Sequence, residues 1–165
     1  ISGAEETVIV KSPELIEEII GECVSNFKKR HPDVNLKIHV PDEPLTVNVD
    51  AMLIEQVLMN LLDNAVYHGK SMTELCIDAS AAGDSVVIAV SDNGVGLDPD
   101  IIPELFKGQL GPSKGHSFDS NKFRGIGLAV CNAIVTAHGG SITAANRPTG
   151  GAVFEFTIPK EDSTQ

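Results

Sequence analysis

The sequence has few basic residues. Its 165 residues include 12 Lys and Arg against 23 Asp and Glu, which gives a formal net charge of -11. A nucleic-acid backbone or an anionic membrane surface binds clusters of Lys and Arg, so this balance argues against either one as the main partner. Local positive sites for a small anion remain compatible with it. We expect no nucleic-acid partner and no membrane contact by this chain.

Cysteine is also scarce. Cys23, Cys76 and Cys131 are far apart, odd in number and outside any C-x-x-C pair, which argues against a zinc knuckle or a disulfide framework. A reducing compartment, the cytoplasm, fits this usage better. No stretch approaches the ~18 consecutive apolar residues of a membrane span, and the first residues lack the basic and apolar regions of a signal peptide. We expect the chain as given to be soluble.

Two common nucleotide-binding motifs are missing as well. No G-x-G-x-x-G follows the first predicted strand, and there is no G-x-x-x-x-G-K-[ST]. These absences exclude nucleotide binding by the Rossmann or P-loop route. The length fits one domain, residues 1–165, with one sizeable core.

Residues 53–69 carry the clearest periodic pattern. Apolar side chains recur every three or four residues and make one broad stripe of a helix: Leu53, Val57, Leu58, Leu61, Leu62, Ala65 and Val66. A second, polar stripe has members four residues apart: Gln56, Asn60, Asn64 and His68. Asparagine is a mediocre helix former. The polar stripe therefore indicates either buried amides that satisfy backbone groups or a site for an oxygen-rich ligand and a hard metal ion.

The segments before this helix predict short elements. An apolar run predicts a strand over residues 7–10, and Ser12-Pro13-Glu14 combines an N-cap, a first-turn proline and an early acid, which predicts a helix from there to about Lys29. Alternating residues predict strands over 36–40 and 45–49, joined by a turn at residues 41–44. Asp50 is expected to cap the central helix, which ends near Gly69.

A second informative site follows the next pair of strands. Residues 74–81 and 85–90 flank a turn and predict a hairpin, and the second strand runs into Asp92-Asn-Gly-Val-Gly96. Gly94 and Gly96 let the backbone turn tightly and approach a ligand, while Asp92 holds a carboxylate at a rigid strand end. An ordinary turn that closes a strand is the alternative interpretation.

Residues 98–124 have a sequence pattern that differs from that of the preceding helices and strands. Residues 101–106 predict a short helix, and the following stretch has no sustained period, as expected of a binding loop, a lid or a disordered segment. Lys107 and Arg124 lie at its ends, so it is either a locally basic flap that meets phosphates or a solvated loop. At residues 124–128 two glycines are expected to open an apolar helix, whose first N–H groups attract anions. This helix ends at residues 138–140, where His138 is interpreted as a cation-capable residue of the last turn. Strands over 141–145 and 152–159 follow.

These elements predict an α+β fold. Three long helices and strands arriving in pairs suit a two-layer sandwich, in which the helices cover one face of a mixed β-sheet. A long loop over about residues 107–124 lies outside these two layers.

The ordered set of Asn60-Leu-Leu-Asp-Asn-Ala65, Asp92-Asn-Gly-Val-Gly96, Leu105-Phe106 and Gly125-Ile-Gly-Leu128 resembles the N, G1, F and G2 boxes of the catalytic ATP-binding (HATPase, Bergerat-type) domain of bacterial two-component sensor histidine kinases. The resemblance covers nearly the whole chain, and four boxes in order are far more specific than one. Residues 53–62 and 146–154 look most like the Kdp-type sensor kinases that govern potassium uptake.

The resemblance implies a role for each matching residue. Asn64 matches the ligand of the Mg²⁺ that bridges the ATP phosphates, and an amide oxygen suits that ion. Asp92 matches the carboxylate that accepts a hydrogen bond from the adenine amino group. Gly94 and Gly96 would let the backbone pass close to the nucleotide. The G2 residues, which would place a helix N-terminus at the phosphates, are Gly125, Gly127 and Leu128. Residues 107–124 would form the ATP lid.

Asn60 distinguishes two chemistries. In the related ATPases of gyrase, mismatch-repair and Hsp90 type, the residue four before the Mg²⁺ ligand is a Glu that activates water. Asparagine does not titrate near neutral pH and cannot act as that base. The sequence therefore favours phosphoryl transfer to a protein histidine, with positioning and charge neutralisation supplying most of the catalysis. Asn60 is the predicted catalytic residue.

The predicted nucleotide contacts also include residues at the edges of the boxes. Tyr67 stands where the family usually has a Lys, with His68 beside it, so a phosphate contact is expected to be lost or moved. The remaining predicted contacts are Lys107 and Arg124. Phe123 replaces the first glycine of the G2 box, and Gln109 replaces a common Phe of the F box.

No histidine of the chain stands in the His-Glu-[LF]-Arg-x-Pro context of the family's phosphoacceptor. We therefore expect a monomeric fragment that binds ATP and Mg²⁺ without phosphorylating itself. Its expected partners are the histidine-bearing dimerisation domain of the same kinase and a response regulator, with the parent protein an inner-membrane sensor. Two alternatives remain, a nucleotide-free interaction module and a Bergerat-type ATPase.

Overall fold

The computed structural model describes residues 8–68, 72–107 and 118–161, and it describes only the backbone of residue 68 and of residues 118–126. The elements are, in order, β1 (Ser12–Leu15), α1 (Ile16–Arg30), β2 (Asn35–His39), β3 (Thr46–Val49), α2 (Ala51–His68), β4 (Glu74–Ala82), β5 (Ser85–Asp92), the short 3-10 helix η2 (Ile102–Glu104), α3 (Phe118–Ala137), β6 (Ser141–Asn146) and β7 (Ala152–Pro159).

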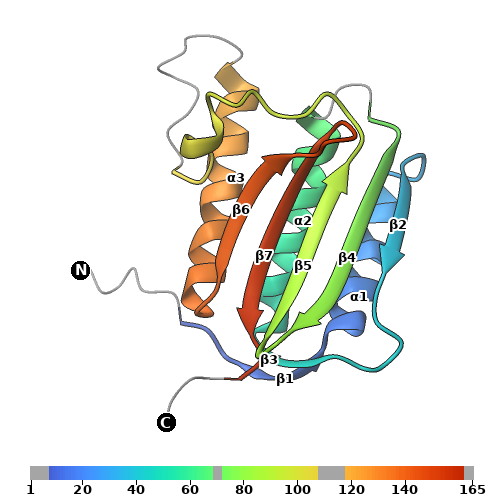
Figure 1. The fold of residues 1–165 in the computed structure, drawn as a ribbon, viewed down its shortest axis with the longest axis vertical. Helices are drawn as coiled ribbons and strands as arrows, with labels where there is room; N and C mark the ends of the chain where they lie inside the picture. The colour runs from blue at the N-terminus through green and yellow to red at the C-terminus, as the bar shows by residue number, and fades with distance from the viewer. Residues whose placement is uncertain (1–7, 69–71, 108–117, 162–165) are drawn as a thin grey trace.

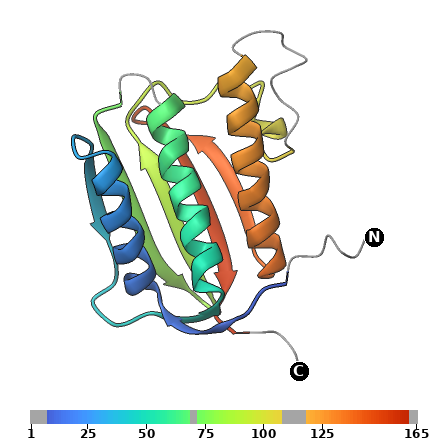
Figure 2. The same ribbon diagram turned by 180° about the vertical axis from the view of Figure 1, so that it is seen from behind.

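Two layers make up the fold. Five strands form one sheet in the order β2-β4-β5-β7-β6, in which β2 and β4 are parallel and the other pairs are antiparallel. Helices α1, α2 and α3 cover one face of this sheet, with α2 in the middle, and leave the other face open (Figures 1 and 2). The predicted α+β two-layer class with a mixed sheet is confirmed. A separate two-stranded sheet joins β1 to β3.

Helix α2 is the centre of the core, as its periodicity predicts. Val57, Leu58, Leu61 and Leu62 are fully buried. At the start of the helix the side chain of Asp50 accepts a hydrogen bond from the backbone N–H of Leu53 at 3.3 Å, which confirms the predicted cap. Burial of each CH₂ group stabilises the folded state by about 0.8 kcal/mol. This apolar stripe is therefore a main source of stability.

His138 ties the start of α2 to the end of α3. Its Nε2 accepts a hydrogen bond from the backbone N–H of Asp50 at 3.0 Å, and its Nδ1 lies 2.9 Å from the carbonyl oxygen of Ile134. Because Nε2 is an acceptor, Nδ1 carries the proton and donates it to Ile134. His138 is 3% exposed. The interpretation of this residue as a cation-capable cap is therefore corrected, since it is a buried imidazole that joins two helices.

The N-terminal elements differ from the prediction. Residues 8–10 form no strand, and the segment 12–14 is part of β1 instead of the first turn of a helix. Pairing with β3 decides this, since Ser12 lies opposite Val49 in the ladder. Helix α1 then begins at Ile16, whose N–H donates to the carbonyl oxygen of Leu45 at 2.9 Å. A long-range partner thus replaces the side-chain cap that the local sequence offered.

The turn at residues 41–44 does not join a hairpin. Strands β2 and β3 belong to different sheets, because β2 pairs with β4 and β3 pairs with β1. A tight hairpin needs residues that adopt positive φ, whereas this segment is Pro41-Asp-Glu-Pro44. Proline holds φ negative and keeps the preceding residue extended. The hairpin predicted for β4 and β5 is confirmed.

None of the helices in the described ranges is long and apolar enough to cross a lipid bilayer.

Candidate functional site

The end of the sandwich where α2 and β5 finish brings the predicted residues together. The last turns of α2, the loop after β5 and the turn between β6 and β7 all lie at this end, beside the first turns of α3 (Figures 1 and 2). These segments are far apart in the sequence. Only the packing of helices on the sheet makes them neighbours, so the site is a product of the fold.

The polar stripe of α2 becomes more buried towards this end. Gln56 is exposed, Asn60 is partly buried, and Asn64, one turn further on, is 7% exposed. The side-chain amide of Asn60 donates to the carbonyl oxygen of Gly127 in α3 at 3.4 Å. The stripe thus faces α3, and Asn60 links the two helices next to Asn64.

Asp92 is a buried carboxylate at the end of β5, with 5% of its surface exposed. Its Oδ1 accepts hydrogen bonds from the backbone N–H groups of Gly94 at 2.8 Å and Ala152 at 3.4 Å. Among the described residues no donor reaches Oδ2. Burying a carboxylate is costly unless hydrogen bonds satisfy it, so this second oxygen indicates a site for a donor from a ligand.

The loop after Asp92 is held by the end of β6. Asn146 accepts a hydrogen bond from the N–H of Leu97 at 2.6 Å and donates to its carbonyl oxygen at 2.8 Å. Gly96 has φ +85°, and a Cβ there would lie 2.7 Å from Asn146 Oδ1. The loop therefore requires glycine at position 96 for its own packing as well as for any approach to a ligand.

The β6–β7 turn also contacts the backbone of Asp92. The guanidinium of Arg147 donates to the carbonyl oxygen of Asp92 at 2.7 Å. Gly151 has φ +93°, and a Cβ there would lie only 1.9 Å from the same oxygen. Position 151 is thus restricted to glycine by both conformation and space.

Asn93 fixes the opposite side of the loop. Its Oδ1 accepts hydrogen bonds from the N–H groups of Thr73 at 2.9 Å and Glu74 at 3.0 Å, and its Nδ2 donates to Thr73 Oγ1 at 2.8 Å. The start of β4 is therefore tied to the end of β5. Sequence reasoning missed the roles of Asn93, Asn146, Arg147 and Gly151; the glycine pair in the β6–β7 turn was the one available signal.

Helix α3 begins earlier than predicted. It starts at Phe118, so Gly125 and Gly127 lie inside the helix instead of before its N-terminus. Leu128 is 1% exposed and packs in the core. The expectation that these three residues place a helix N-terminus at the phosphates is therefore wrong in this structure. The local signal misled because two glycines usually interrupt a helix, whereas the apolar packing of α3 on α2 carries it through them.

Gly127 nevertheless has space beside it among the described residues. A Cβ added there would meet no heavy atom of the described part of the chain within 4 Å. Packing against these residues therefore does not explain this glycine, although it costs the helix roughly 0.5–1 kcal/mol relative to alanine.

The structure describes only part of the predicted lid and only some of the predicted nucleotide contacts at the edges of the boxes. Residues 108–117 of the predicted lid lie outside the described residues, and residues 118–124 belong to α3 instead of a loop. Lys107 pairs with Glu104 at 3.5 Å, and Tyr67 is 61% exposed. The side chains of His68 and Arg124 lie outside the description. Contact of these four side chains with a nucleotide therefore stays a prediction.

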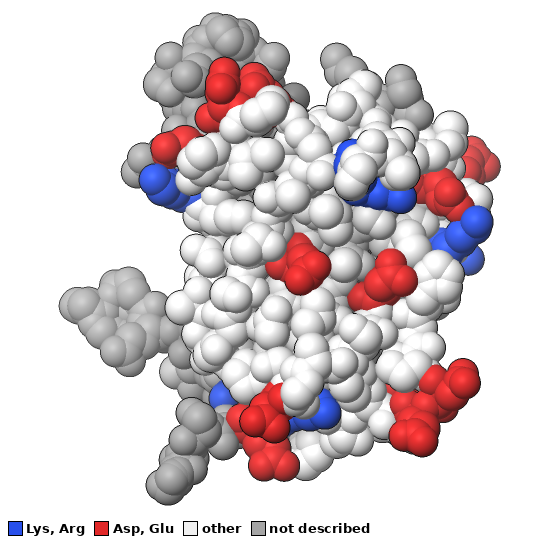
Figure 3. All heavy atoms as spheres, in the orientation of Figure 1, with Lys and Arg blue, Asp and Glu red and all other residues white. Residues whose placement is uncertain are grey.

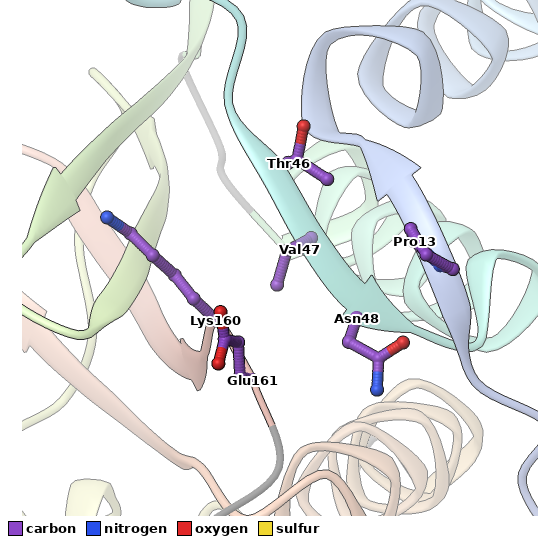
Figure 4. Close-up of a pocket in the computed structure, with 6 residues that line it drawn as sticks. All are labelled: Pro13, Thr46, Val47, Asn48, Lys160 and Glu161. Atoms are coloured by element: carbon purple, nitrogen blue, oxygen red, sulfur yellow. The ribbon is translucent and has the colours of Figure 1, made fainter.

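A separate hollow lies at the opposite end of the molecule. Its volume is about 440 Å³, and it is lined by Pro13, Thr46, Val47, Asn48, Lys160 and Glu161. Figure 4 shows that it lies between the β1–β3 sheet and the chain after β7. No predicted site residue lines it. The candidate site is placed at the Asp92 end because the buried carboxylate and the asparagine stripe lie there.

One protein family matches residues 49–162, described as histidine kinase-, DNA gyrase B-, and HSP90-like ATPase. Among curated relatives, the chain is 39% identical over 155 residues to the sensor protein KdpD of Clostridium acetobutylicum and 38% identical over 152 residues to KdpD of Escherichia coli. These alignments cover 94% and 91% of this chain but 17% and 16% of the relatives. The chain thus spans about a sixth of the length of these proteins.

Solved structures share the fold. The nucleotide-free catalytic domain of histidine kinase ThkA has a TM-score of 0.76 at 26% identity, covering 92% of this chain and 96% of that one. Full-length ShkA in complex with AMPPNP has a TM-score of 0.80 at 25% identity, covering 99% and 34%. ThkA in complex with the response regulator TrrA has a TM-score of 0.78 at 26% identity, covering 98% and 45%. Since the family match spans most of the chain and includes Asn64, Asp92 and Gly127, the chain belongs to the histidine kinase-, DNA gyrase B- and HSP90-like ATPase family.

Proposed function

We propose that this chain is the catalytic ATP-binding domain of a sensor histidine kinase, which positions Mg-ATP for transfer of the γ-phosphate to a histidine on a separate dimerisation domain. The observation that carries the proposal is the Asp92 carboxylate. It is buried, its Oδ1 is occupied by two backbone N–H groups, and Oδ2 receives no hydrogen bond from a described residue.

Asp92 would select adenine. The adenine amino group donates hydrogen bonds, and a carboxylate oxygen accepts them. Guanine carries a carbonyl oxygen at the equivalent ring position, which would face the carboxylate as a second acceptor. A buried, rigidly held acceptor discriminates strongly between the two bases, since guanine would leave the carboxylate oxygen without a hydrogen bond.

Asn64 would bind the metal ion. An amide oxygen is a suitable ligand for Mg²⁺, which prefers oxygen. Asn64 is buried on α2, one turn beyond the contact of Asn60 with Gly127, so its position is set by helix packing and needs little reorganisation. When bound, Mg²⁺ neutralises charge on the phosphates. Gly127, which has space beside it among the described residues, would let the phosphates approach the α3 backbone.

Transfer is favoured over hydrolysis because no described carboxylate of α2 is directed at this region. Glu55 accepts a hydrogen bond from Asn26 of α1, and Asp63 binds Arg30 of α1 at 3.1 Å. Both therefore face α1, whereas Asn60 faces α3. Asn60 itself cannot take a proton from water near neutral pH. Its proposed role is to position groups for phosphoryl transfer.

The parent protein and its partners follow by similarity. KdpD is named a sensor protein, and ThkA was solved in complex with a response regulator. We infer that the parent of this chain is a membrane sensor that responds to potassium, with this domain in the cytoplasm. Its partners would be a histidine-bearing dimerisation domain of the same kinase and a downstream response regulator. We also propose that the chain binds Mg²⁺ and that it is a monomer.

Calorimetric titration of ATP with and without Mg²⁺ tests the site. We expect binding that Mg²⁺ strengthens, and a loss of at least tenfold in affinity in Asp92→Asn. The amide oxygen of the substituted side chain can still accept the backbone N–H groups, while its amino group opposes that of adenine. Asp84→Asn is the matched control, because Asp84 lies in the turn before β5 and at the other end of that strand.

Two results would overturn the proposal. Absence of binding at millimolar ATP would identify a nucleotide-free interaction module. Steady phosphate release by the chain alone, lost in Asn60→Ala, would identify an ATPase. Phosphate transfer is expected only after the histidine-bearing domain of the parent protein is added.

A further inference from the structure

Three metal-binding side chains meet on the face of the sheet that the helices leave open. Cys76 and Asp78 are two residues apart on β4 and therefore project from the same face. His39 on β2 lies directly opposite Asp78 in the parallel ladder. Leu75 and Ile77, the alternate residues of β4, are fully buried, which places the three polar side chains on the outer face. This is the β2–β4 edge of the sheet in Figure 1.

The polar atoms of the three side chains lie close together. His39 Nδ1 lies 3.0 Å from Asp78 Oδ1 and 3.3 Å from Cys76 Sγ, and Cys76 Sγ lies 3.4 Å from the other carboxylate oxygen, Asp78 Oδ2. One ligand atom from each residue lies within 4.8 Å of the other two. Bond lengths of about 2.0–2.3 Å around a tetrahedral zinc ion hold its ligand atoms roughly 3.4–3.6 Å apart. The separations of His39 Nδ1 from Asp78 Oδ1 and from Cys76 Sγ are within about 0.4 Å of these values. Because the atoms of all three residues already lie within 4.8 Å of one another, side-chain rotations suffice to bind an ion.

We propose that His39, Cys76 and Asp78 form a binding site for a divalent ion of the zinc class. A thiolate, an imidazole and a carboxylate are the ligands that Zn²⁺ takes in proteins, whereas Mg²⁺ and Ca²⁺ prefer oxygen alone. With three protein ligands, the fourth position would hold water or an external ligand. An ion bound here would link the edge strand β2 to β4, since its ligands come from both.

The surroundings suit a cation. The neighbouring Lys37 ammonium is paired with Glu74 at 2.7 Å, which offsets its charge. In Figure 3 acidic side chains stand singly near the centre of this face, and Lys and Arg form no cluster there. A metal ion binds the thiolate form of cysteine, so its binding here would displace the Cys76 thiol proton into solvent.

Titration of Zn²⁺ into the reduced, metal-free chain tests the site by calorimetry, without nucleotide. We expect one ion per chain and a loss of affinity of at least tenfold in each of Cys76→Ser, Asp78→Asn and His39→Gln. Co²⁺ in place of Zn²⁺ should give thiolate-to-metal charge-transfer absorption that is missing in Cys76→Ser. This absorption identifies the sulfur ligand directly and does not depend on activity.

Glu155→Gln is the matched control. Glu155 lies in the same cross-strand row as Asp78, with Ala89 between them, and is therefore roughly 10 Å away. It contributes the same charge to the same face but cannot share the ion. Unchanged binding in Cys76→Ser and Asp78→Asn would overturn the proposal, as would absence of binding at millimolar Zn²⁺. An equal loss in Glu155→Gln would also overturn it, because general surface charge would then explain the binding.

Discussion

Gly127 is a glycine that packing against the described residues does not require. It lies inside α3, and no heavy atom of the described part of the chain lies within 4 Å of an added Cβ. Replacing it by alanine should therefore stabilise the chain by roughly 0.5–1 kcal/mol. If the phosphates of ATP approach this backbone, the same Cβ should weaken ATP binding several-fold. Urea unfolding and calorimetric ATP titration measure the two effects.

Gly21→Ala is the control for this substitution. Gly21 lies in the middle of α1, also with nothing within 4 Å of an added Cβ, but on the helix farthest from α3. It should give the same gain in stability with unchanged ATP affinity. If Gly127→Ala also binds ATP like the unmodified chain, the glycine has no role in nucleotide approach.

Gly151 is the opposite case, because both conformation and space restrict it. Its φ is +93°, and an added Cβ would lie 1.9 Å from the carbonyl oxygen of Asp92. Gly151→Ala should destabilise the chain by more than about 2 kcal/mol. Gly150→Ala shares the positive φ, +107°, but has nothing within 4 Å, so it should cost only the backbone strain. If urea unfolding shows the same loss of stability in Gly151→Ala and Gly150→Ala, the close contact of the added Cβ with Asp92 is relieved without an energetic cost.

At the scale of elements, Asn146 joins the end of β6 to the loop that follows Asp92. Asn146→Ala removes both hydrogen bonds to Leu97 and should cost about 1 kcal/mol or more, because it leaves two partly buried backbone groups without these partners. Hydrogen exchange of the Leu97 amide should become faster while that of Phe156 in β7 stays slow. Asn146→Asp keeps an acceptor oxygen for the Leu97 N–H, so its Leu97 exchange rate should lie between those of the unmodified chain and Asn146→Ala. Equal exchange at both amides in every variant would contradict this role.

The elements also show which features local sequence can predict. Helix α2 was predictable because its apolar stripe and its Asp50 cap lie within one segment, and the β4–β5 hairpin because its turn is local. The start of α1 was not, since pairing of Ser12 with Val49 overrides a favourable cap. The same limit applies to the site. Asp92 was predicted from its position at a strand end, whereas the contacts of Asn146 and Arg147 depend on residues some 50 positions away.

The molecule as a whole is a sandwich whose candidate site is assembled at one end from α2, β5, α3 and the β6–β7 turn. The core contains two thiols, Cys23 in α1 and Cys131 in α3, both fully buried. Burial raises the pKa of Cys131 to about 12. Burial, and then the charges of Glu55 and Asp63, raise the pKa of Cys23 to about 12. Protonated thiols are thus part of the folded state.

Stability should therefore fall in alkaline solution. The unfolded chain loses these thiol protons from about pH 9, whereas the folded chain keeps them to about pH 12. The stabilisation is fully present below pH 9 and is lost as pH rises between these values, at up to about 1.4 kcal/mol per thiol per pH unit. Between pH 8 and pH 10 the two thiols together should account for a loss of about 2–3 kcal/mol. Urea unfolding under reducing conditions measures this loss of stability.

The double variant Cys23→Ala/Cys131→Ala is the control. It should be less stable at pH 8, because it leaves small cavities, but between pH 8 and pH 10 its loss of stability should be smaller by about 2–3 kcal/mol. Parallel losses in the two proteins would mean that other groups, such as the lysines, govern the alkaline transition.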